Sequence, residues 1–132
     1  MSPLRTIRVV AAVVERDGKY LITQRRAAAV LPLLWEFPGG RVEAGETDAQ
    51  ALRREVLHRL GIEVECGKLI SFVSHPYDHY VVDLFLYECD LLGDDLRPLA
   101  VTDYRWVASA DFDQYPFTPA DEASMNKLLG VS

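Results

Sequence analysis

A glycine-rich turn that leads into an acidic helix constrains the fold of this chain more than any other feature. The turn, residues 39–46, reads Gly-Gly-Arg-Val-Glu-Ala-Gly-Glu, and Arg54-Glu55 follow eight and nine residues after Glu46. Glycine lets the backbone approach a bound group closely, and Mg²⁺ prefers carboxylate and carbonyl oxygens as ligands. The stretch therefore predicts a loop and a helix that together bind phosphate and magnesium.

Two residues of the same helix depart from this pattern. A helical turn is about 3.6 residues, so side chains three and four positions after Glu55 lie beside it. These positions hold His58 and Arg59 instead of two further acids. A neutral imidazole adds no charge, and an arginine repels a cation and attracts a phosphate. We therefore expect a weakened metal site.

The composition favours one globular domain over residues 1–132. The chain has 14 Lys and Arg against 20 Asp and Glu, which gives a net charge of −6. Proteins that bind nucleic acid polymers or anionic membranes usually present a basic surface, so we expect neither as a partner. A small phosphorylated ligand fits the composition, because clustered arginines can reverse the sign of the potential locally.

Targeting and cysteine usage point to the cytoplasm. The sequence has no apolar run of the ~18 residues that a membrane span needs, and its first residues lack the core of a signal peptide. Cys66 and Cys89 lie in apolar, strand-like segments without the spacing of metal ligands. This context predicts buried, reduced thiols.

Hydrophobic patterning predicts several strands. Residues 7–14 are rich in Val, Ile and Ala, which is typical of a strand buried on both faces. Asp17-Gly18 predicts a tight turn with residues 19–25 as the hairpin partner. Further strands are expected at residues 69–74, 80–89 and 104–107, with a polar turn at residues 75–79.

Two helices have clear terminal signals. The segment Thr47-Asp48-Ala49-Gln50 matches a capping box, and Gly61 stands where a helix usually ends. A last helix is expected to begin at Thr118-Pro119, with threonine as its cap and proline in its first turn. Alternation of strands and helices without a linker predicts one compact α/β domain.

The residues around the turn resemble the signature of the Nudix hydrolases, in its MutT-like branch. That signature is Gly, five residues, Glu, seven residues, Arg-Glu-aliphatic, one residue, Glu-Glu, one residue, Gly-aliphatic. Its fixed positions are matched by Gly40, Glu46, Arg54, Glu55, Val56, Gly61 and Ile62, and the Glu-Glu pair is replaced by His58-Arg59. Residues 24–26, 35–40 and 119–122 extend the similarity over most of the chain.

The resemblance implies a Nudix-type α/β/α sandwich with a mixed central sheet, and it implies roles for particular residues. Glu55 and the carbonyl of Gly39 would bind the metal, with Asp103 as a further acid for metal or water. Glu46 and Arg54 would support catalysis together with Glu55. Arg25 and Arg26 would bind the phosphates and Asp121 the edge of the base, while Arg59, which departs from the signature, is expected to bind phosphate because of its own charge. The implied cofactor is Mg²⁺, with Mn²⁺ as a substitute.

Simpler interpretations of the same residues stay open. Glu55 can pair with Arg59 at i+4 on the helix surface. Glu46 can act on the helix dipole, and Asp121 sits at the third helical position, where an acid stabilises a helix start. Neighbouring residues of a strand point to opposite faces, so we expect only one of Arg25 and Arg26 to reach a pocket.

The function that the resemblance implies is Mg²⁺-dependent hydrolysis of a nucleoside diphosphate derivative, chiefly a nucleoside triphosphate, to a monophosphate and pyrophosphate. The expected partner is thus a small nucleotide, and both a monomer and a homodimer are compatible with the sequence. One alternative is a nucleotide-binding domain of the same fold with impaired catalysis. The other is a nucleotide-sugar hydrolase.

Overall fold

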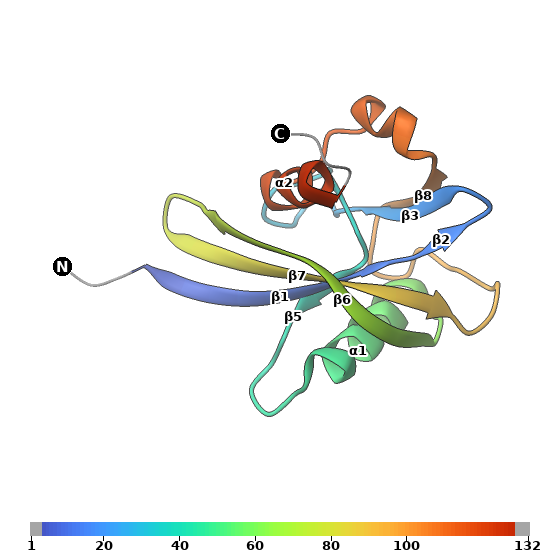
Figure 1. The fold of residues 1–132 in the computed structure, drawn as a ribbon, viewed down its shortest axis with the longest axis horizontal. Helices are drawn as coiled ribbons and strands as arrows, with labels where there is room; N and C mark the ends of the chain where they lie inside the picture. The colour runs from blue at the N-terminus through green and yellow to red at the C-terminus, as the bar shows by residue number, and fades with distance from the viewer. Residues whose placement is uncertain (1–3, 129–132) are drawn as a thin grey trace.

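A four-stranded mixed sheet forms the centre of the computed structural model, which describes residues 4–128 (Figure 1). Its strand order is β5-β1-β7-β6, with β1 at Arg5–Val13, β5 at Gly39–Arg41, β6 at Val64–Pro76 and β7 at Tyr80–Leu91. Strand β1 is parallel to β7 and antiparallel to β5, while β6 and β7 are antiparallel. The predicted mixed sheet is confirmed.

A second, smaller sheet packs beside the first and was not predicted. It contains β2 (Glu15–Arg16), β3 (Lys19–Gln24), β4 (Trp35–Glu36) and β8 (Asp103–Val107), with β3 pairing antiparallel to the other three. The predicted turn at Asp17-Gly18 forms, with positive φ at both residues, but it joins β3 to the short strand β2 and not to the strand expected at residues 7–14, which pairs with β5 and β7. Strand β8 was expected, but its pairing with β3 was not.

Two helices cover opposite faces of the mixed sheet (Figure 1). Helix α1 (Asp48–Leu60) packs on β1, β5 and β6, and α2 (Pro119–Leu128) packs on β6 and β7. The expected α/β/α sandwich is confirmed. A 3-10 helix, η1 (Ser109–Gln114), precedes α2 and was not predicted. No helix among residues 4–128 has the length and apolar character needed to cross a membrane.

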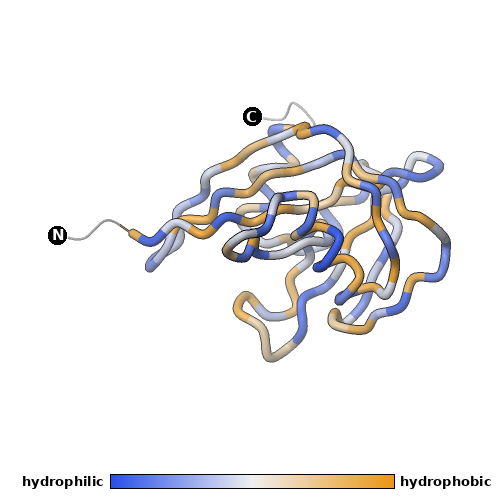
Figure 2. The backbone as a smooth tube through the Cα atoms, turned by 90° about the horizontal axis from the view of Figure 1, so that it is seen from below, coloured by the Kyte–Doolittle hydropathy of each residue, from blue (hydrophilic) through white to orange (hydrophobic). Residues whose placement is uncertain are grey.

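Strand β1 divides the hydrophobic core into two halves. Val10 and Ala12 pack in the half that contains the buried residues of α1, whereas Ala11 and Val13 pack in the half below α2. Figure 2 shows hydrophobic segments (orange) alternating with hydrophilic segments (blue) along the backbone. The prediction of a strand buried on both faces is correct for this part of β1. Its first residues, including Arg5 and Arg8, are exposed, although Arg8 pairs with Asp48 at the start of α1.

Strands β6 and β7 are longer than the sequence pattern predicted. Strand β6 lies at the edge of the sheet and continues through His75 and Pro76, which pair with Val82 and Val81. The predicted turn at residues 75–79 is therefore too long. An edge strand tolerates proline, because the missing N–H faces away from the neighbouring strand. Irregular register between Cys66 and Ser71 also weakens the periodicity from which strand ends are read.

The two cysteines are cross-strand neighbours on β6 and β7 and both are free thiols. Cys89 is buried, and burial raises the pKa of its thiol to about 12. Cys66 is only partly buried, so the prediction of a buried thiol is correct for Cys89 alone.

Candidate active site

The glycine turn brings the backbone of β5 against both β1 and α1. A Cβ atom at Gly39 would lie 2.0 Å from the carbonyl oxygen of Val10. A Cβ atom at Gly40 would lie 2.4 Å from the carboxyl carbon of Glu55. Only glycine fits at position 39, where the neighbour is backbone, whereas at Gly40 the neighbour is the Glu55 side chain, which lies directly over the strand.

Helix α1 begins and ends as its sequence predicts. Thr47 Oγ1 accepts a hydrogen bond from the Gln50 N–H at 3.1 Å, and the Gln50 side chain accepts one from the Thr47 N–H at 2.9 Å. Gly61 ends the helix in the left-handed conformation, with φ at 67°. These ends fix the rotation of the helix, and Glu55 faces inward with 9% of its surface exposed.

Arg54 joins the end of the glycine turn to the helix. Its Nε and Nη2 donate to the two carboxylate oxygens of Glu46 at 2.7 and 2.9 Å, and its Nη1 donates to Glu55 Oε1 at 2.6 Å. Nη2 also donates to the carbonyl of Arg41 at 2.8 Å. Hydrogen bonds from Arg54 and from the Glu43 N–H lower the pKa of Glu46 to about 2. Glu46 and Arg54 thus form an ionic clasp that holds the turn against α1.

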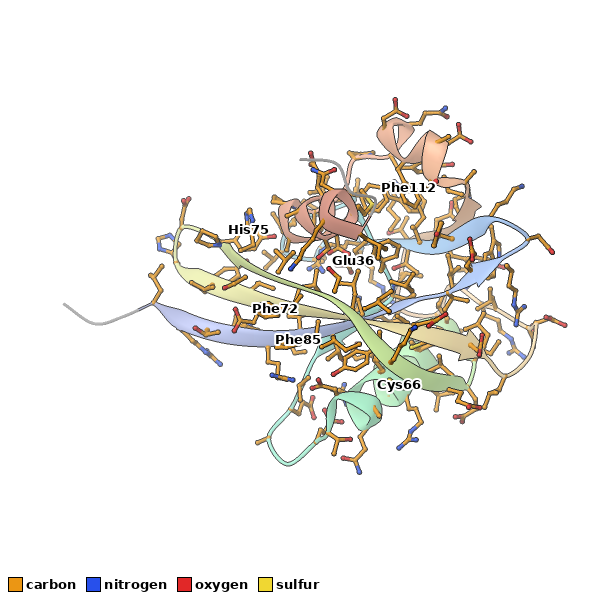
Figure 3. The ribbon with its side chains drawn as sticks, viewed as in Figure 1. Glu36, Cys66, Phe72, His75, Phe85 and Phe112 are labelled. Atoms are coloured by element: carbon orange, nitrogen blue, oxygen red, sulfur yellow. The ribbon has the colours of Figure 1, made fainter. Side chains whose placement is uncertain are left out.

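Glu36 lies at the centre of the site, although it was not predicted as a site residue. Arg25 Nη1 donates to its two oxygens at 3.1 and 3.2 Å, and Arg59 Nη1 donates to Oε2 at 3.4 Å. In Figure 3, Glu36 is labelled near the middle of the molecule, between α2 and the mixed sheet. Burial raises the pKa of Glu36, the positive charges of Arg25 and Arg59 oppose that rise, and the negative charge of Glu55 adds to it.

Arg59 connects the two buried carboxylates. Its Nε donates to Glu55 Oε2 at 2.8 Å, so the i+4 pairing offered as the simpler interpretation of Glu55 does form. With Nη1 on Glu36, its guanidinium lies between an acid of β4 and an acid of α1. Acidic and basic side chains therefore alternate through the site, in the order Arg25, Glu36, Arg59, Glu55, Arg54 and Glu46.

These residues do not fit a resident divalent metal. Both oxygens of Glu55 already accept hydrogen bonds from guanidinium groups, and a cation cannot share that environment without displacing them. Between residues 4 and 128, no three His, Cys, Asp or Glu side chains gather closely enough to hold a metal ion. Asp103 lies on β8, where its carboxylate pairs with Arg105 and accepts from the Tyr104 N–H. The metal roles of Gly39, Glu55 and Asp103 stay predictions.

A cavity of about 640 Å³ opens beside the ionic residues. Its lining includes Gly39 of the glycine turn with Glu36 and Arg59, and also Tyr77, whose hydroxyl accepts a hydrogen bond from the Ala120 N–H of α2 at 3.1 Å. This volume is within the range of ~300–1,000 Å³ that small-molecule sites occupy. The cavity therefore has a charged region next to the glycine turn and an aromatic region next to α2.

Asp121 is buried at the start of α2. Its Oδ1 accepts from the Phe37 N–H at 2.9 Å, and its Oδ2 accepts from Thr118 Oγ1 at 2.7 Å. Burial and the nearby charge of Glu36 raise its pKa to about 7. The hydrogen bond with Thr118 agrees with the simpler interpretation of Asp121 as an acid that stabilises the helix start. Asp121 also lines the cavity, so its predicted role in base recognition stays a prediction.

A second, smaller cavity of about 160 Å³ adjoins the first. Its lining consists of Arg25, Arg26, Ala29, His58, Arg59 and Ala100. Arg25 reaches both cavities, whereas Arg26 lines only the smaller one and donates to the Leu99 carbonyl at 2.6 Å. This arrangement agrees with the expectation that only one of the two arginines, here Arg25, reaches the main pocket.

The sequence carried a signal for Glu36 that was missed. It is a single acid between Trp35 and Phe37, both of which are buried in the core. Residues that alternate along a strand face opposite sides, so an acid between two core aromatics has to point into another environment. Tyr77 and Tyr80, which stack with ring centroids 5.1 Å apart in the cavity wall, carried no comparable signal.

Comparison with known proteins agrees with this architecture. The family model described as NUDIX domain matches residues 9–127. The CTP pyrophosphohydrolase of Escherichia coli K12 is 36% identical over 128 residues, which cover 97% of this chain and 95% of that protein. The 8-oxo-dGTP diphosphatase of Haemophilus influenzae is 29% identical over 127 residues, covering 95% and 93% of the two chains.

Solved structures give the same result. The E. coli ORF135 protein superposes with a TM-score of 0.80 at 32% identity, over 96% of this chain and 91% of that one. A MutT Nudix hydrolase from Burkholderia pseudomallei superposes with a TM-score of 0.78 at 26% identity, over 94% and 98%. The match to the family model covers nearly the whole chain, and we conclude that this protein belongs to the Nudix hydrolase family, among its MutT-like members.

Proposed function

We propose that this protein is a pyrophosphohydrolase of nucleoside triphosphates. In the reaction, water forms a new bond to one of the two phosphorus atoms beside the α,β-bridging oxygen, and the bond from that phosphorus to the bridging oxygen breaks. The products are a nucleoside monophosphate, pyrophosphate and a proton. The observation that carries the proposal is the large cavity, in which an arginine-rich region and an aromatic region lie within one space.

The named activities of the relatives support this class of substrate. One relative is a CTP pyrophosphohydrolase and another is an 8-oxo-dGTP diphosphatase, and this chain covers more than nine-tenths of each. Arg25 and Arg59 are suited to phosphate oxygens, because a guanidinium offers a planar set of donors. Tyr77 and Tyr80 offer flat faces for the base, and Asp121 lies near them in the wall.

The predicted substrate-binding roles enter this proposal unchanged, and the predicted catalytic and metal roles are replaced. Arg25, Arg26 and Arg59 bind phosphates, Asp121 contacts the base, and Glu46 and Arg54 hold the glycine turn in position. Glu55 orients Arg54 and Arg59 through the hydrogen bonds described above. Asp103 has no place in the proposal, because its carboxylate is engaged on β8.

Nudix hydrolases generally use a divalent metal, typically Mg²⁺. Because the ionic residues do not fit a resident metal, we propose that Mg²⁺, or Mn²⁺ in its place, enters already bound to the triphosphate. We also propose that residues 1–132 form one domain that works in the cytoplasm on small nucleotides and not on nucleic acid polymers.

A panel of nucleoside triphosphates tests the function. Purified protein should convert at least one of them, with CTP and 8-oxo-dGTP included, to the monophosphate and pyrophosphate. Chromatography of the nucleotide products with separate assays for pyrophosphate and phosphate identifies the broken bond. Release of phosphate alone, or no turnover of any member at high enzyme concentration, would contradict the proposal. Adding nucleotide sugars to the panel tests the alternative substrate class.

The engagement of Glu55 by two arginines favours a second candidate, a nucleotide-binding domain with impaired catalysis. The double substitution of His58→Glu and Arg59→Glu separates the two candidates. A large gain in rate would indicate that the natural site is impaired. An unchanged or lower rate would indicate that the natural ionic arrangement is already the working one, as the first proposal requires.

A further inference from the structure

We propose that the smaller cavity is a metal-independent anion site that binds the two terminal phosphates of the nucleotide directly. Arg59 then supplies, as a fixed side chain, the positive charge that a resident metal would otherwise provide. This inference rests on the proposed function for the identity of its ligand. Its geometry rests on the six residues that line the cavity.

The chemistry of the lining selects an anion. Three of the six residues are arginines, one is histidine and two are alanines, so the lining contains no carboxylate. His58 and Arg59 both line this cavity. The two positions of α1 at which the Nudix signature has Glu-Glu therefore face the same cavity. Replacing two acids by a histidine and an arginine has thus changed the kind of ligand that this surface can bind.

The arginines are held in place before any ligand arrives. Arg25 Nε donates to the Val30 carbonyl at 2.6 Å and its Nη1 donates to Glu36, while Arg26 is anchored on Leu99. Arg59 is anchored on Glu55 and Glu36, and its side chain is 22% exposed. Within residues 4–128, Nη2 of Arg25 and Nη2 of Arg59 make no hydrogen bond, so each keeps donors for a phosphate. Preorganised donors bind at a lower entropic cost.

The position of the cavity fits one end of a nucleotide. Arg25 and Arg59 line both cavities, so a ligand can pass from the larger space to the smaller one between them. The aromatic region of the larger cavity lies near Tyr77 and Tyr80, and Arg26 belongs only to the smaller cavity. A nucleotide with its base near the tyrosines would therefore extend its terminal phosphates toward Arg26.

Calorimetric titration of inorganic pyrophosphate in the presence of EDTA tests the inference without nucleotide or turnover. The natural protein should bind pyrophosphate in EDTA, and it should bind no Mn²⁺ when the ion is titrated alone and followed by electron paramagnetic resonance. Arg59→Glu should weaken pyrophosphate binding more than tenfold, because an attractive charge becomes a repulsive one. It should also create a Mn²⁺ site, since residues 36, 55 and 59 would then all be carboxylates.

Arg53→Glu is the matched control. It makes the same change of charge on the same helix, at an exposed residue outside both cavities, and should leave pyrophosphate binding within about twofold of the natural protein. If Arg59→Glu does not fold, Arg26→Gln provides the test. It should weaken binding in EDTA by about tenfold, the effect of losing one charge-assisted hydrogen bond.

Three results would overturn the inference. They are pyrophosphate binding that requires a divalent metal, binding of Mn²⁺ alone by the natural protein, and equal loss of pyrophosphate binding in the Arg59 and Arg53 variants. If nucleotides are hydrolysed while pyrophosphate needs a metal, the anion site is wrong and the proposed function stands. If pyrophosphate binds in EDTA and no nucleotide is hydrolysed, the anion site stands and the proposed function is wrong.

Discussion

Replacing Arg59 by methionine should destabilise the fold in a manner that depends on pH. Methionine keeps much of the length of the side chain and removes its charge. Glu36 would then keep only Arg25 as a partner, and Glu55 only Arg54. Two carboxylates that lie close together inside the protein would thereby share one positive charge fewer.

The expected magnitude follows from burial. Removing one partner of a fully buried ion pair costs about 3–5 kcal/mol. Arg59 is 22% exposed and each carboxylate keeps a second guanidinium, so the loss should be smaller. We expect the free energy of unfolding to fall by about 2 kcal/mol at pH 8. For a chain of this length, that corresponds to a fall in Tm of roughly 6 °C.

The pH dependence follows from the pKa of Glu36, which is already raised in the folded protein. A carboxyl with a raised pKa stabilises the fold at low pH, and this stabilisation is lost as the pH rises through the folded pKa. Without Arg59 that pKa rises further. The difference between variant and natural protein should therefore be small near pH 4, where the group is protonated in both, and should grow toward pH 8.

Urea unfolding at pH 4, 6 and 8, followed by circular dichroism, measures this difference. Arg97→Met is the control, because Arg97 forms an exposed pair with Asp95 and its loss should cost less than about 0.5 kcal/mol. Adding Glu36→Gln to the Arg59 variant should restore part of the stability at pH 8. An Arg59→Met protein as stable as the natural one at pH 8 would refute the argument that Arg59 neutralises the buried acids.

Three further substitutions test other parts of the structure. Gly39→Ala should lower the free energy of unfolding by more than about 3 kcal/mol, because its Cβ would meet the Val10 carbonyl; a small loss in urea unfolding would mean that β5 and β1 can separate at little cost. Thr47→Ala should cost about 1 kcal/mol by the same assay, and no loss would show that the cap contributes nothing. Asp121, with a pKa of about 7, holds a proton in the folded state between pH 4 and pH 7 that the unfolded state lacks, and this stabilisation is lost as the pH rises. Asp121→Asn should therefore gain stability relative to the natural protein from pH 4 to pH 8, and a constant difference would contradict the raised pKa.

Local signals account for what the sequence predicted well. Helix α1 was predicted at both ends, because Thr47, Gln50 and Gly61 act within a few residues of the chain. The β2–β3 turn was predicted for the same reason, since Asp17-Gly18 adopts positive φ without distant contacts. The mixed sheet and the two helical layers followed from the family resemblance, and the fold confirms them.

Distant contacts account for what it did not predict. The full length of β6 depends on pairing with β7, and Pro76 is tolerated only because β6 is an edge strand. The second sheet depends on β8 reaching β3 across the molecule. In the candidate site, Glu36 acquires its importance from Arg25 and Arg59, which approach from other elements, so no periodicity along β4 could identify its partners.

The parallel pairing of β1 with β7 also sets the order in which the protein can be completed during its synthesis. The first strand, the glycine turn and α1 leave the ribosome early, and β5 can dock on β1 at once. The parallel neighbour of β1 and the tyrosine wall follow later, and α2 leaves last. A nascent chain can thus dock the glycine turn and α1 on β1 first, while the two cavities are completed only when Leu99, Ala100 and then α2 have been made.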